Sequence, residues 1–258
     1  MDKLIAIVTG PERNGTTYLK NLLDSHPNIF SGFETGFLID DDFSKSIPWS
    51  DYVIQGNYHW GLPKNINLTD KNLTITDKYK LLLDNKGSYE GHIQNLIRKS
   101  THIVDKTPAY FRILPQVCDR INNKSIPIII TIKYFQDYYT SLMKRDATEK
   151  SFLKLVNQNI EVMIWLKQNK NKLKNIYLFC YEDIIKRRFV RNLKQIIGKR
   201  INTMSEMSFE KYEEKINGIK TGNPYFNWKP SKLKEIPENL KVLEIKYNRL
   251  IDELKEKV

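Results

Sequence analysis

The sequence predicts an α/β fold in which helices flank both faces of one parallel sheet. Short apolar runs bounded by Gly, Pro, Asn or charged residues recur along the chain, and each is typical of a buried strand. These runs are Leu4–Val8, Ile29–Phe33, His102–Val104, Pro127–Ile132 and Ile176–Cys180. Because segments with helical spacing alternate with them, we expect crossover connections that place the strands in parallel.

Seven segments between or after the strands are predicted to be helices. In Phe152–Leu173 apolar residues recur at intervals of three to four, so one face of this helix packs against the core and carries no chemistry. The others are Thr16–Leu23, Asn95–Lys99, Ala109–Ile121, Asp137–Lys144, Ile184–Ile197 and a Lys/Glu-rich final helix at about Glu238–Lys255.

The 258 residues are predicted to form a single domain, 1–258, because the chain contains no internal repeat and no low-complexity linker. Residues 40–90 are rich in Asp, Asn, Tyr and Trp and lack a clear period, which indicates an insertion over one edge of the sheet. Such insertions often bind the variable substrate. Residues 205–236 combine Gly and Pro with Lys and aromatic residues, and they indicate an irregular lid.

Charge and hydrophobicity exclude several classes of protein. Lys and Arg number 42 against 30 Asp and Glu, a formal net charge of +12 that favours anionic partners. Hydrophobic residues make up 40% of the chain, which excludes disorder as a description of the whole. The longest apolar runs, Leu4–Val8 and Ile126–Ile132, are far shorter than the about 20 residues of a membrane-spanning helix. We therefore expect no transmembrane segment and no cleaved export signal.

The two cysteines indicate a compartment. Cys118 and Cys180 are far apart in the sequence, and both have apolar neighbours. This usage is typical of buried thiols in a reducing environment and not of a disulfide scaffold or a metal site. The expected location is the cytoplasm.

One segment has the architecture of a phosphate-binding loop. The apolar strand Leu4–Val8 leads into a loop bounded by Gly10 and Gly15, and a helix begins at Thr16. Backbone N–H groups at such a turn, together with the positive end of the helix that follows, form an anion site. The alternative is a plain strand–turn–helix connection with an incidental pair of glycines.

The loop departs from the motif that binds nucleoside triphosphates. Gly10 and Gly15 have the spacing of G-x-x-x-x-G, and Thr17 stands at the Ser/Thr position that holds a metal. The position that should be Lys is Thr16, so a γ-phosphate would lose its main cationic contact. This argues against an ATPase or a kinase. Arg13 supplies positive charge from inside the loop instead.

Residues 11–19 (Pro-Glu-Arg-Asn-Gly-Thr-Thr-Tyr-Leu) resemble the 5′-phosphosulfate loop of sulfotransferases that use 3′-phosphoadenosine 5′-phosphosulfate (PAPS). Further segments match the family in order. His26-Pro27 is similar to the His-Pro that often precedes its second strand, and residues 31–35 (Ser-Gly-Phe-Glu-Thr) resemble a segment of tyrosylprotein sulfotransferases. The resemblance implies a P-loop-like sulfotransferase fold, with the donor bound by Arg13, Asn14, Gly15, Thr16 and Thr17.

The family also implies a site for the 3′-phosphate. There a strand ends in a basic residue and a Ser follows eight positions later on a helix, as Lys133 and Ser141 do here. Ser141 and Arg145 are spaced to share one helix face and converge on a phosphate with Lys133, although an ordinary helix surface is the alternative. The family usually has Arg at the first position, so Lys133 makes a point contact where Arg would make a bidentate one.

Two further segments are similar to the donor site. Residues 181–183 (Tyr-Glu-Asp) resemble a segment whose Tyr lies near the adenine, so Tyr181 is predicted to stack on the base or to be a core residue at a strand end. Lys220-Thr-Gly222 with Trp228-Lys229 is similar to a C-terminal basic loop that closes over the 3′-phosphate. A solvated loop is the alternative for Lys220.

Three residues are predicted to carry the chemistry. Residues 102–108 (His-Ile-Val-Asp-Lys-Thr-Pro) resemble the family's Lys-Thr-Pro segment, which implies that Lys106, just past a strand, and Arg13 stabilise charge at the sulfonate. Small-molecule sulfotransferases carry a His base where this chain has Pro108, so that base is excluded. Glu34, at the end of the second strand, is the candidate base, unless it only pairs with Arg13 or Lys106.

The predicted reaction is transfer of sulfonate from PAPS to an acceptor hydroxyl, with adenosine 3′,5′-bisphosphate (PAP) as product. A carbohydrate or glycan is favoured as acceptor over a tyrosine or a small molecule. The aromatic residues of the insertion either stack on sugars or form its core; they are Trp49, Tyr52, Tyr58 and Trp60. No metal is expected, since no cluster of Cys, His and carboxylates has ligand spacing.

Two other functions stay open. A P-loop phosphotransferase using ATP and Mg²⁺ would keep the strand–loop–helix but lacks the Lys at Thr16. A nucleic-acid-binding protein would account for the net charge of +12, but the Lys residues are scattered along the chain, and no nucleic-acid partner is expected.

Overall fold

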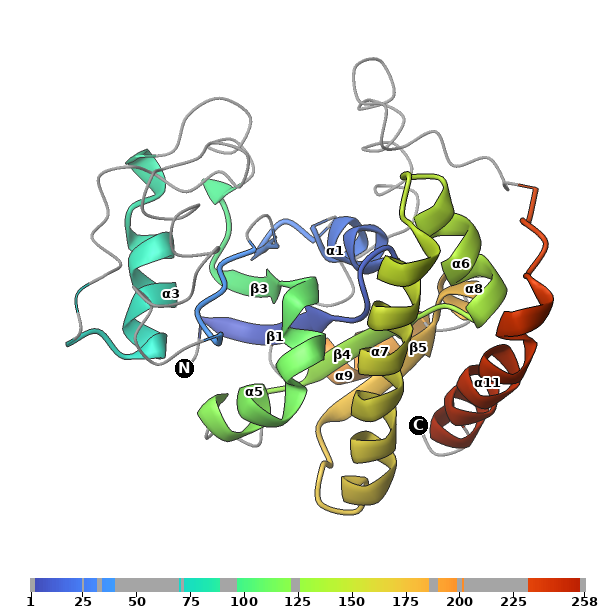
Figure 1. Cartoon of the computed structure of the whole chain (residues 1–258). Coiled ribbons are helices and arrows are strands. Elements are labelled where there is room, and N and C mark those ends of the chain that lie inside the picture. Colours follow the sequence, from blue (N-terminus) through green and yellow to red (C-terminus); the bar gives the residue numbers. More distant parts are fainter. Residues whose placement is uncertain are drawn as a thin grey trace.

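Five parallel strands form the centre of the computed structural model of the chain (Figure 1). The structure describes residues 3–24, 26–31, 34–39, 70, 72–88, 97–121, 126–185, 190–198, 201 and 232–255. The strands lie in the order β2-β3-β1-β4-β5. Their bounds are β1 (Leu4–Thr9), β2 (Ile29–Phe30), β3 (His102–Lys106), β4 (Ile128–Ile132) and β5 (Ile176–Cys180). The α/β fold predicted from the sequence is confirmed.

The pairing of β1 brings three strand ends together. Val8 is opposite Lys106 of β3, and Thr9 is opposite Ile130 of β4. After β1 the chain forms β2 and β3 on one side of β1, and it then crosses to form β4 and β5 on the other side, so the carboxyl end of β1 is a topological switch point. Ligands of open α/β sheets bind in the crevice outside the strand ends at such a point.

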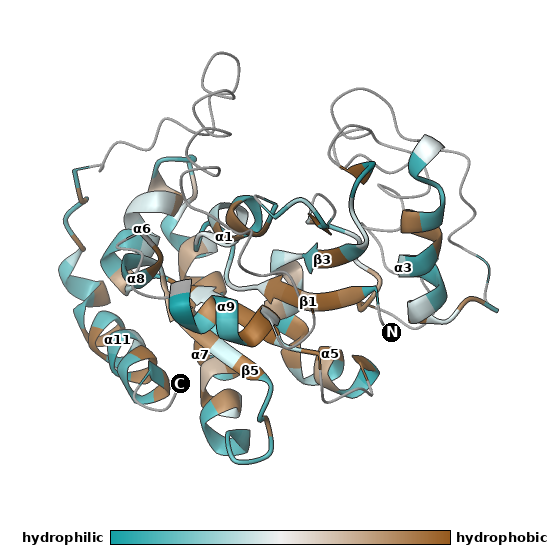
Figure 2. Cartoon of the chain, turned by 180° about the vertical axis from the view of Figure 1, so that it is seen from behind, coloured by the Kyte–Doolittle hydropathy of each residue, from teal (hydrophilic) through white to brown (hydrophobic). Residues whose placement is uncertain are grey.

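Helices cover both faces of the sheet. The face seen in Figure 1 carries α5 (Leu114–Ile121) and α7 (Glu149–Asn169), and the face turned toward the viewer in Figure 2 carries α9 (Val190–Gly198). The other described helices are α1 (Thr16–Leu23), α3 (Ile75–Asp84), α6 (Phe135–Met143), α8 (Tyr181–Ile185) and α11 (Lys241–Lys255), with short 3-10 helices η3 (Lys86–Ser88), η4 (Pro108–Ile113) and η7 (Glu238–Leu240).

Alternation along the strands divides the core in two. Ile103 of β3 packs with the helices seen in Figure 1, whereas Val104 packs with α1 and α9. Successive side chains of a strand point to opposite faces, so Asp105 lies on the side of Ile103 and Lys106 on the side of Val104. This alternation places the two charged residues at the end of β3 in different layers.

Local signals account for the starts of several helices. Thr74 caps α3 through its hydroxyl, which accepts from the backbone N–H of Asp77, while the Asp77 carboxylate accepts from the N–H of Thr74. Thr148 caps α7 in a similar way, accepting from the N–H of Ser151. Helix α3 lies within the predicted insertion 40–90 and was not predicted as a separate element, although the capping box marks its start.

Two strand predictions need correction. The second strand was predicted to run to Phe33, but β2 ends at Phe30, so Glu34 lies beyond the strand and not at its end. The third strand was predicted to end at Val104, but β3 continues through Lys106, because Asp105 and Lys106 keep the pairing with Ile7 and Val8. Lys106 is therefore the last residue of the strand and does not follow it.

Several helix predictions change in detail. The predicted helix Asp137–Lys144 is α6, Phe135–Met143, and the predicted helix Phe152–Leu173 is α7, Glu149–Asn169. The segment Ala109–Ile121 begins as the 3-10 helix η4, which Pro108 starts, and continues as α5. The segment Ile184–Ile197 comprises α8 and α9. The final helix comprises η7 and α11. Asn95 and Leu96 of the predicted helix Asn95–Lys99 lie outside the described residues, as do residues 40–69 of the insertion and most of the lid, 205–231.

Within the described part of the chain, none of the helices is long and apolar enough to span a bilayer.

Glu182, the second residue of α8, is a buried carboxylate with no donor from another described residue. Burial raises the pKa of its carboxyl group above the ordinary value of 4.5, and the charges of Asp137 and Asp183 act in the same direction. The charge of Lys255, which pairs with Asp183 at 2.9 Å, opposes them. The ionised form of Glu182 therefore destabilises the fold.

We expect Glu182→Gln to raise the melting temperature by about 2 °C at pH 8 and to leave it unchanged at pH 4. A group whose pKa is raised on folding favours the folded state below its unfolded pKa, near 4.5, and this contribution is lost as the pH rises. Thermal unfolding followed by circular dichroism at both pH values measures the effect. Asp183→Asn, which breaks an ion pair, is the control and should not stabilise. An equal shift at both pH values would contradict the prediction.

Candidate functional site

At its two glycines the backbone of the loop after β1 lies very close to neighbouring groups. A Cβ atom at Gly10, where φ is 150°, would lie 2.1 Å from the carbonyl oxygen of Thr131. A Cβ atom at Gly15, where φ is 94°, would lie 2.4 Å from the ring of Tyr181. The loop thus passes directly against the ends of β4 and β5, and neither position leaves room for a side chain.

Asn14 ties the loop to β4. Its side chain is fully buried; Nδ2 donates to the carbonyl of Glu12 at 3.0 Å, and Oδ1 accepts from the backbone N–H of Lys133 at 2.5 Å. The Glu12 carboxylate in turn pairs with Arg112 of η4 at 2.5 Å. These contacts fix the loop from inside the protein. The contact of Asn14 with a bound phosphosulfate stays a prediction.

The loop presents its remaining groups at the start of α1. Gly15 is the N-cap of α1, no side chain caps the helix, and no acidic residue lies in its first turn. Arg13 is exposed and adopts φ 68°, a left-handed conformation that is uncommon for Arg and that clusters at functional sites. Thr16 is buried, and Thr17 is exposed. The first turn of α1 therefore suits an anion.

Lys133 follows β4 and lies next to the same loop. Its Nζ lies 4.4 Å from the centroid of the Tyr181 ring, a cation–π contact. Burial lowers the pKa of the Lys133 ammonium to about 8; the charge of Asp137 opposes this, and the charge of Arg13 adds to it. Lys133 and Arg13 thus repel each other across one site. A bound anion would relieve that repulsion.

Tyr181 is the first residue of α8 and is 8% exposed. Its ring contacts the Gly15 position and Lys133, so it lines the loop at the end of β5. This place agrees with a ring near a bound nucleotide and with a core residue at a strand end. Stacking on adenine stays a prediction. Lys220, predicted on the lid, lies outside the described residues.

Of the two predicted partners of Lys133, Ser141 lies on α6 and Arg145 does not. Ser141 is half-buried on α6, but this helix ends at Met143, so Arg145 lies beyond the helix and is exposed. The expectation that Ser141 and Arg145 share a helix face is therefore wrong, because the chain turns out of the helix before Arg145. Their convergence on a phosphate with Lys133 stays a prediction.

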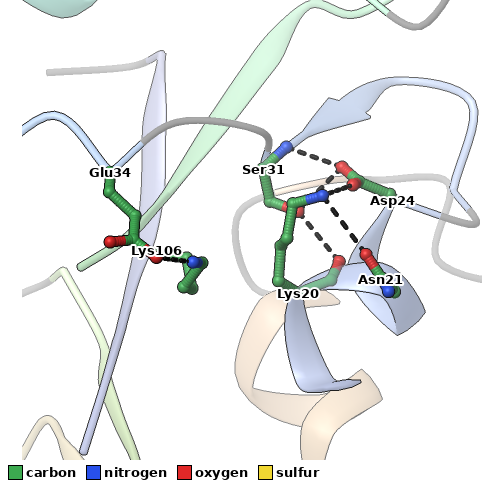
Figure 3. A network of polar contacts seen from close by, with 6 residues as sticks. All are labelled: Lys20, Asn21, Asp24, Ser31, Glu34 and Lys106. Atoms are coloured by element: carbon green, nitrogen blue, oxygen red, sulfur yellow. Dashed lines mark hydrogen bonds and ion pairs between the residues drawn. The ribbon is translucent and has the colours of Figure 1, made fainter. Parts of the chain in front are cut away.

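Glu34 and Lys106 form a buried ion pair at the end of β3 (Figure 3). The two side chains are 9% and 6% exposed. Burial lowers the pKa of the Lys106 ammonium to about 7, and the charge of Lys20 acts in the same direction. The charge of Asp24 opposes both effects. The pairing that the sequence left open as an alternative for Glu34 is thus present.

A second group of contacts anchors the chain between β2 and Glu34 (Figure 3). Asp24 accepts from the backbone N–H of Ser31 at 2.6 Å and lies 2.7 Å from its hydroxyl. Lys20 pairs with Asp24 at 2.9 Å and donates to Asn21. The end of β2 is therefore fastened to the last turn of α1.

The carboxyl end of β1 connects the loop and the ion pair. The backbone N–H of Thr107 donates to the carbonyl of Val8 at 3.1 Å, and the hydroxyl of Thr9 donates to the carbonyl of Thr107 at 3.0 Å. The residue after Lys106 is thus bonded to the strand that leads into the loop. The site brings the loop after β1, whose helix start suits an anion, beside a buried carboxylate–ammonium pair.

Other reactive groups in the described chain are inert or absent. Cys118 and Cys180 are free thiols, and burial raises the pKa of both to about 12, so neither is a thiolate at neutral pH. Among the described residues there is no group of three or more His, Cys, Asp or Glu side chains that could hold a metal ion. His59 and His92 lie outside the described residues, as does the aromatic cluster around Trp49.

Sequence analysis missed several residues that build the site. The clamp made by Asn14 was not foreseen, nor was Arg120, which donates to the carbonyls of Leu38 and Ile39 and holds the chain after Glu34. Asp105 was also missed. A charged residue inside an apolar strand was the available signal for it, since a buried charge needs partners.

We expect Gly10→Ala to lower the free energy of unfolding by at least about 2 kcal/mol, because the added methyl group meets backbone and the β4 strand cannot yield. Urea denaturation measures the effect. Gly87→Ala is the matched control: a Cβ atom there has no neighbour within 4 Å, and stability should stay within about 0.5 kcal/mol. Equal stability of the two variants would show that the loop does not press on β4.

Comparison with known proteins identifies the fold and no more. The sequence matches no protein-family model and is significantly similar to no curated protein. Among solved structures, the chain is similar to the sulfotransferase domain from the Synechococcus PCC 7002 olefin synthase, with a TM-score of 0.53 and 13% identity over 96% of this chain and 93% of that one.

Two further structures are similar at lower scores. They are the sulfotransferase domain from the curacin biosynthetic pathway (TM-score 0.49, 15% identity, 98% of this chain and 97% of that one) and the sulfotransferase STF9 from Mycobacterium avium (TM-score 0.36, 10% identity, 99% and 75%). The assignment rests on the first structure, which agrees with the five-stranded parallel sheet and its flanking helices. The chain has the sulfotransferase fold.

Proposed function

We propose that this chain is a sulfotransferase that transfers the sulfonate group of PAPS to an acceptor hydroxyl. The observation that carries the proposal is the buried Glu34–Lys106 pair beside the loop after β1. An anion site next to a carboxylate and a buried cation supplies what sulfonate transfer needs: a grip on the donor, a base for the acceptor, and charge for the leaving group.

The loop favours this donor over ATP with Mg²⁺. A nucleoside-triphosphate loop places a Lys where this chain has Thr16, and Thr16 is buried. The cations beside the loop are instead Arg13, Lys106 and Lys133, which come from three different parts of the chain. Such an arrangement suits a ligand with two separated anionic groups, as PAPS has on its 5′ and 3′ sides.

Each residue has a part in an in-line displacement. The acceptor oxygen forms a bond to sulfur while the bond between sulfur and the bridging phosphate oxygen breaks, and its electron pair stays on PAP. The acceptor proton passes to Glu34. Arg13, Lys106 and the N–H groups at the start of α1 stabilise the negative charge that grows on the bridging oxygen. Lys133 binds the 3′-phosphate with Ser141 and Arg145.

The ion pair implies an exchange of partners. In the structure Lys106 donates to one oxygen of the Glu34 carboxylate, so Glu34 becomes a stronger base for an acceptor hydroxyl when Lys106 turns away. The sulfonate is an anion that competes with Glu34 for the ammonium. Binding of the donor therefore prepares the base by removing Lys106 from it.

The acceptor is proposed to be a carbohydrate or a glycan, with a tyrosine or a small molecule as the other choices. Residues 40–90 are proposed to bind it and residues 205–236 to cover the donor, within one domain. The free thiols of Cys118 and Cys180 support a reducing, cytoplasmic location as part of the same proposal.

We expect Glu34→Gln to lower turnover by about 10²–10⁴-fold, the usual contribution of a general base, with the dissociation constant of PAP changed less than threefold. Formation of PAP from PAPS with a set of hydroxyl acceptors measures turnover, and calorimetry measures binding. Glu253→Gln is the control, since Glu253 is a carboxylate of α11 that pairs with Lys167 and Arg249 and belongs to neither the loop nor the ion pair, and it should keep turnover within threefold of wild type. Equal losses of turnover and PAP affinity in Glu34→Gln would place Glu34 in donor binding.

Binding of PAP is expected to be independent of metal and stronger than binding of AMP, and the ratio of the two affinities should fall as the pH rises through about 8. Lys133, whose pKa is about 8, meets only the 3′-phosphate, and it loses its charge above that pH. Lys106 affects both ligands alike, so its titration cancels in the ratio. Calorimetry between pH 7 and 9.5 measures both affinities.

Lys133→Ala tests the same assignment. It should remove most of the preference for PAP over AMP together with the pH dependence of the ratio. A ratio that still falls with pH in Lys133→Ala would show that another group binds the 3′-phosphate. Preference for ATP with Mg²⁺ over PAP would overturn the proposed function.

A further inference from the structure

Asp105 is a carboxylate with no exposed surface that accepts four hydrogen bonds from hydroxyl groups. Oδ2 accepts from Thr35 at 2.7 Å, Tyr79 at 2.5 Å and Tyr110 at 2.8 Å, and Oδ1 accepts from Thr107 at 2.7 Å. The four hydroxyl-bearing residues are themselves buried. They come from the segment after β2, from α3, from η4 and from the end of β3, so one side chain joins four parts of the fold.

The network touches both members of the ion pair through their neighbours. Thr35 directly follows Glu34, while Asp105 and Thr107 stand on either side of Lys106. Because successive residues of β3 point to opposite faces, the network lies in one layer of the core and the ion pair lies in the other. The hydrogen bond between Thr35 and Asp105 therefore holds the backbone that carries Glu34 against the backbone that carries Lys106.

Two of the hydroxyl groups also accept hydrogen bonds from the chain that follows Glu34. The N–H of Phe37 donates to the Thr35 hydroxyl at 3.3 Å, and the N–H of Leu38 donates to the Tyr110 hydroxyl at 3.2 Å. An ionised carboxylate can only accept, so it turns the protons of both hydroxyls toward itself and leaves their lone pairs for the backbone. The charge of Asp105 thus sets both hydroxyls as acceptors for the N–H groups of Phe37 and Leu38.

The protonation states agree with this direction. Burial raises the pKa of Tyr79 and Tyr110 well above the ordinary value, and the charge of Asp105 raises both further, so both phenols keep their protons. Burial also raises the pKa of Asp105, whereas the four hydroxyl donors act to lower it. The hydroxyls thereby compensate the buried charge.

We propose that Asp105 is a positioning residue that sets the geometry of the Glu34–Lys106 pair by orienting Thr35 and Tyr110 toward residues 34–38. The effect of Asp105 on turnover rests on the proposed function, but its effect on the placement of residues 34–38 does not. Tyr79 donates to the same oxygen from α3, and its ring packs edge-on against Phe37 with 5.2 Å between the ring centroids. Tyr79→Phe keeps this ring contact and removes only the hydroxyl, which makes it the internal control.

The first test is hydrogen exchange followed by mass spectrometry on peptides that cover residues 34–39. Asp105→Asn places an amide N–H group among the hydroxyls, so one hydroxyl that now donates to residue 105 must accept from it instead. Thr35→Val removes the hydrogen bond between residue 35 and Asp105. Both are expected to speed exchange in residues 34–39 at least tenfold while β1 and β4 stay protected. Thr35→Ser restores the hydroxyl and should restore wild-type exchange. Tyr79→Phe should stay within threefold of wild type.

The second test is steady-state kinetics with PAPS on the same variants. Asp105→Asn and Thr35→Val should lower kcat about tenfold or more, with KM for PAPS changed less than threefold, because a misplaced base slows the reaction and leaves donor binding intact. Thr35→Ser and Tyr79→Phe should keep kcat within threefold. A purely structural role would lower kcat in Tyr79→Phe as much as in Thr35→Val at equal loss of melting temperature.

The outcomes of the two tests are independent of each other. Wild-type exchange of residues 34–39 in both Thr35→Val and Asp105→Asn would overturn the inference, whatever the activity. If Asp105→Asn does not fold, Thr35→Val decides alone. Absence of PAPS-dependent turnover in the wild-type protein would overturn the proposed function. The comparison of hydrogen exchange between Thr35→Val and Thr35→Ser would still support or overturn the placement of residues 34–38 by Asp105.

Discussion

The parallel pairing of β1 with β3 on one side and β4 on the other is the constraint on which the site depends. It places the carboxyl ends of three strands at one edge, where β1 leads into the loop that carries Arg13, β3 ends in Lys106 and β4 leads into Lys133. The N–H of Thr107 extends the pairing by one further bond to Val8. Residues that are more than 90 positions apart in the sequence are therefore fixed to one another by backbone hydrogen bonds.

Burial of charge is the cost of this arrangement, and the two charged residues at the end of β3 have partners of different kinds. Lys106 is offset by the carboxylate of Glu34, and Asp105, in the next layer, is offset by four hydroxyl groups. The two solutions have different consequences. An ion pair can exchange its partner for an incoming anion, whereas four hydroxyls from four segments hold one geometry. The Glu34–Lys106 pair can therefore change its partner, while the hydrogen bonds around Asp105 in the next layer keep their geometry.

Much of the donor half of the site could be predicted because its signals are local. The bounds of α1 and β5 agree with the prediction, and the glycines of the loop mark close approaches to Thr131 and Tyr181 that require them. The acceptor half could not be predicted to the same degree. Glu34 lies beyond the end of β2, and its contact with Lys106 joins two residues that are 72 positions apart in the sequence.

The sequence by itself determined the elements and their order, because apolar periodicity and glycine positions are properties of neighbouring residues. It also determined that the loop carries Arg13 and lacks the Lys of a nucleoside-triphosphate site. Only the tertiary structure decided that Glu34 pairs with Lys106, that Asn14 clamps the loop to β4, and that Arg145 lies beyond its helix. Those facts depend on contacts between distant segments, where strand register and the alternation of side chains across the sheet select the partner of each buried charge.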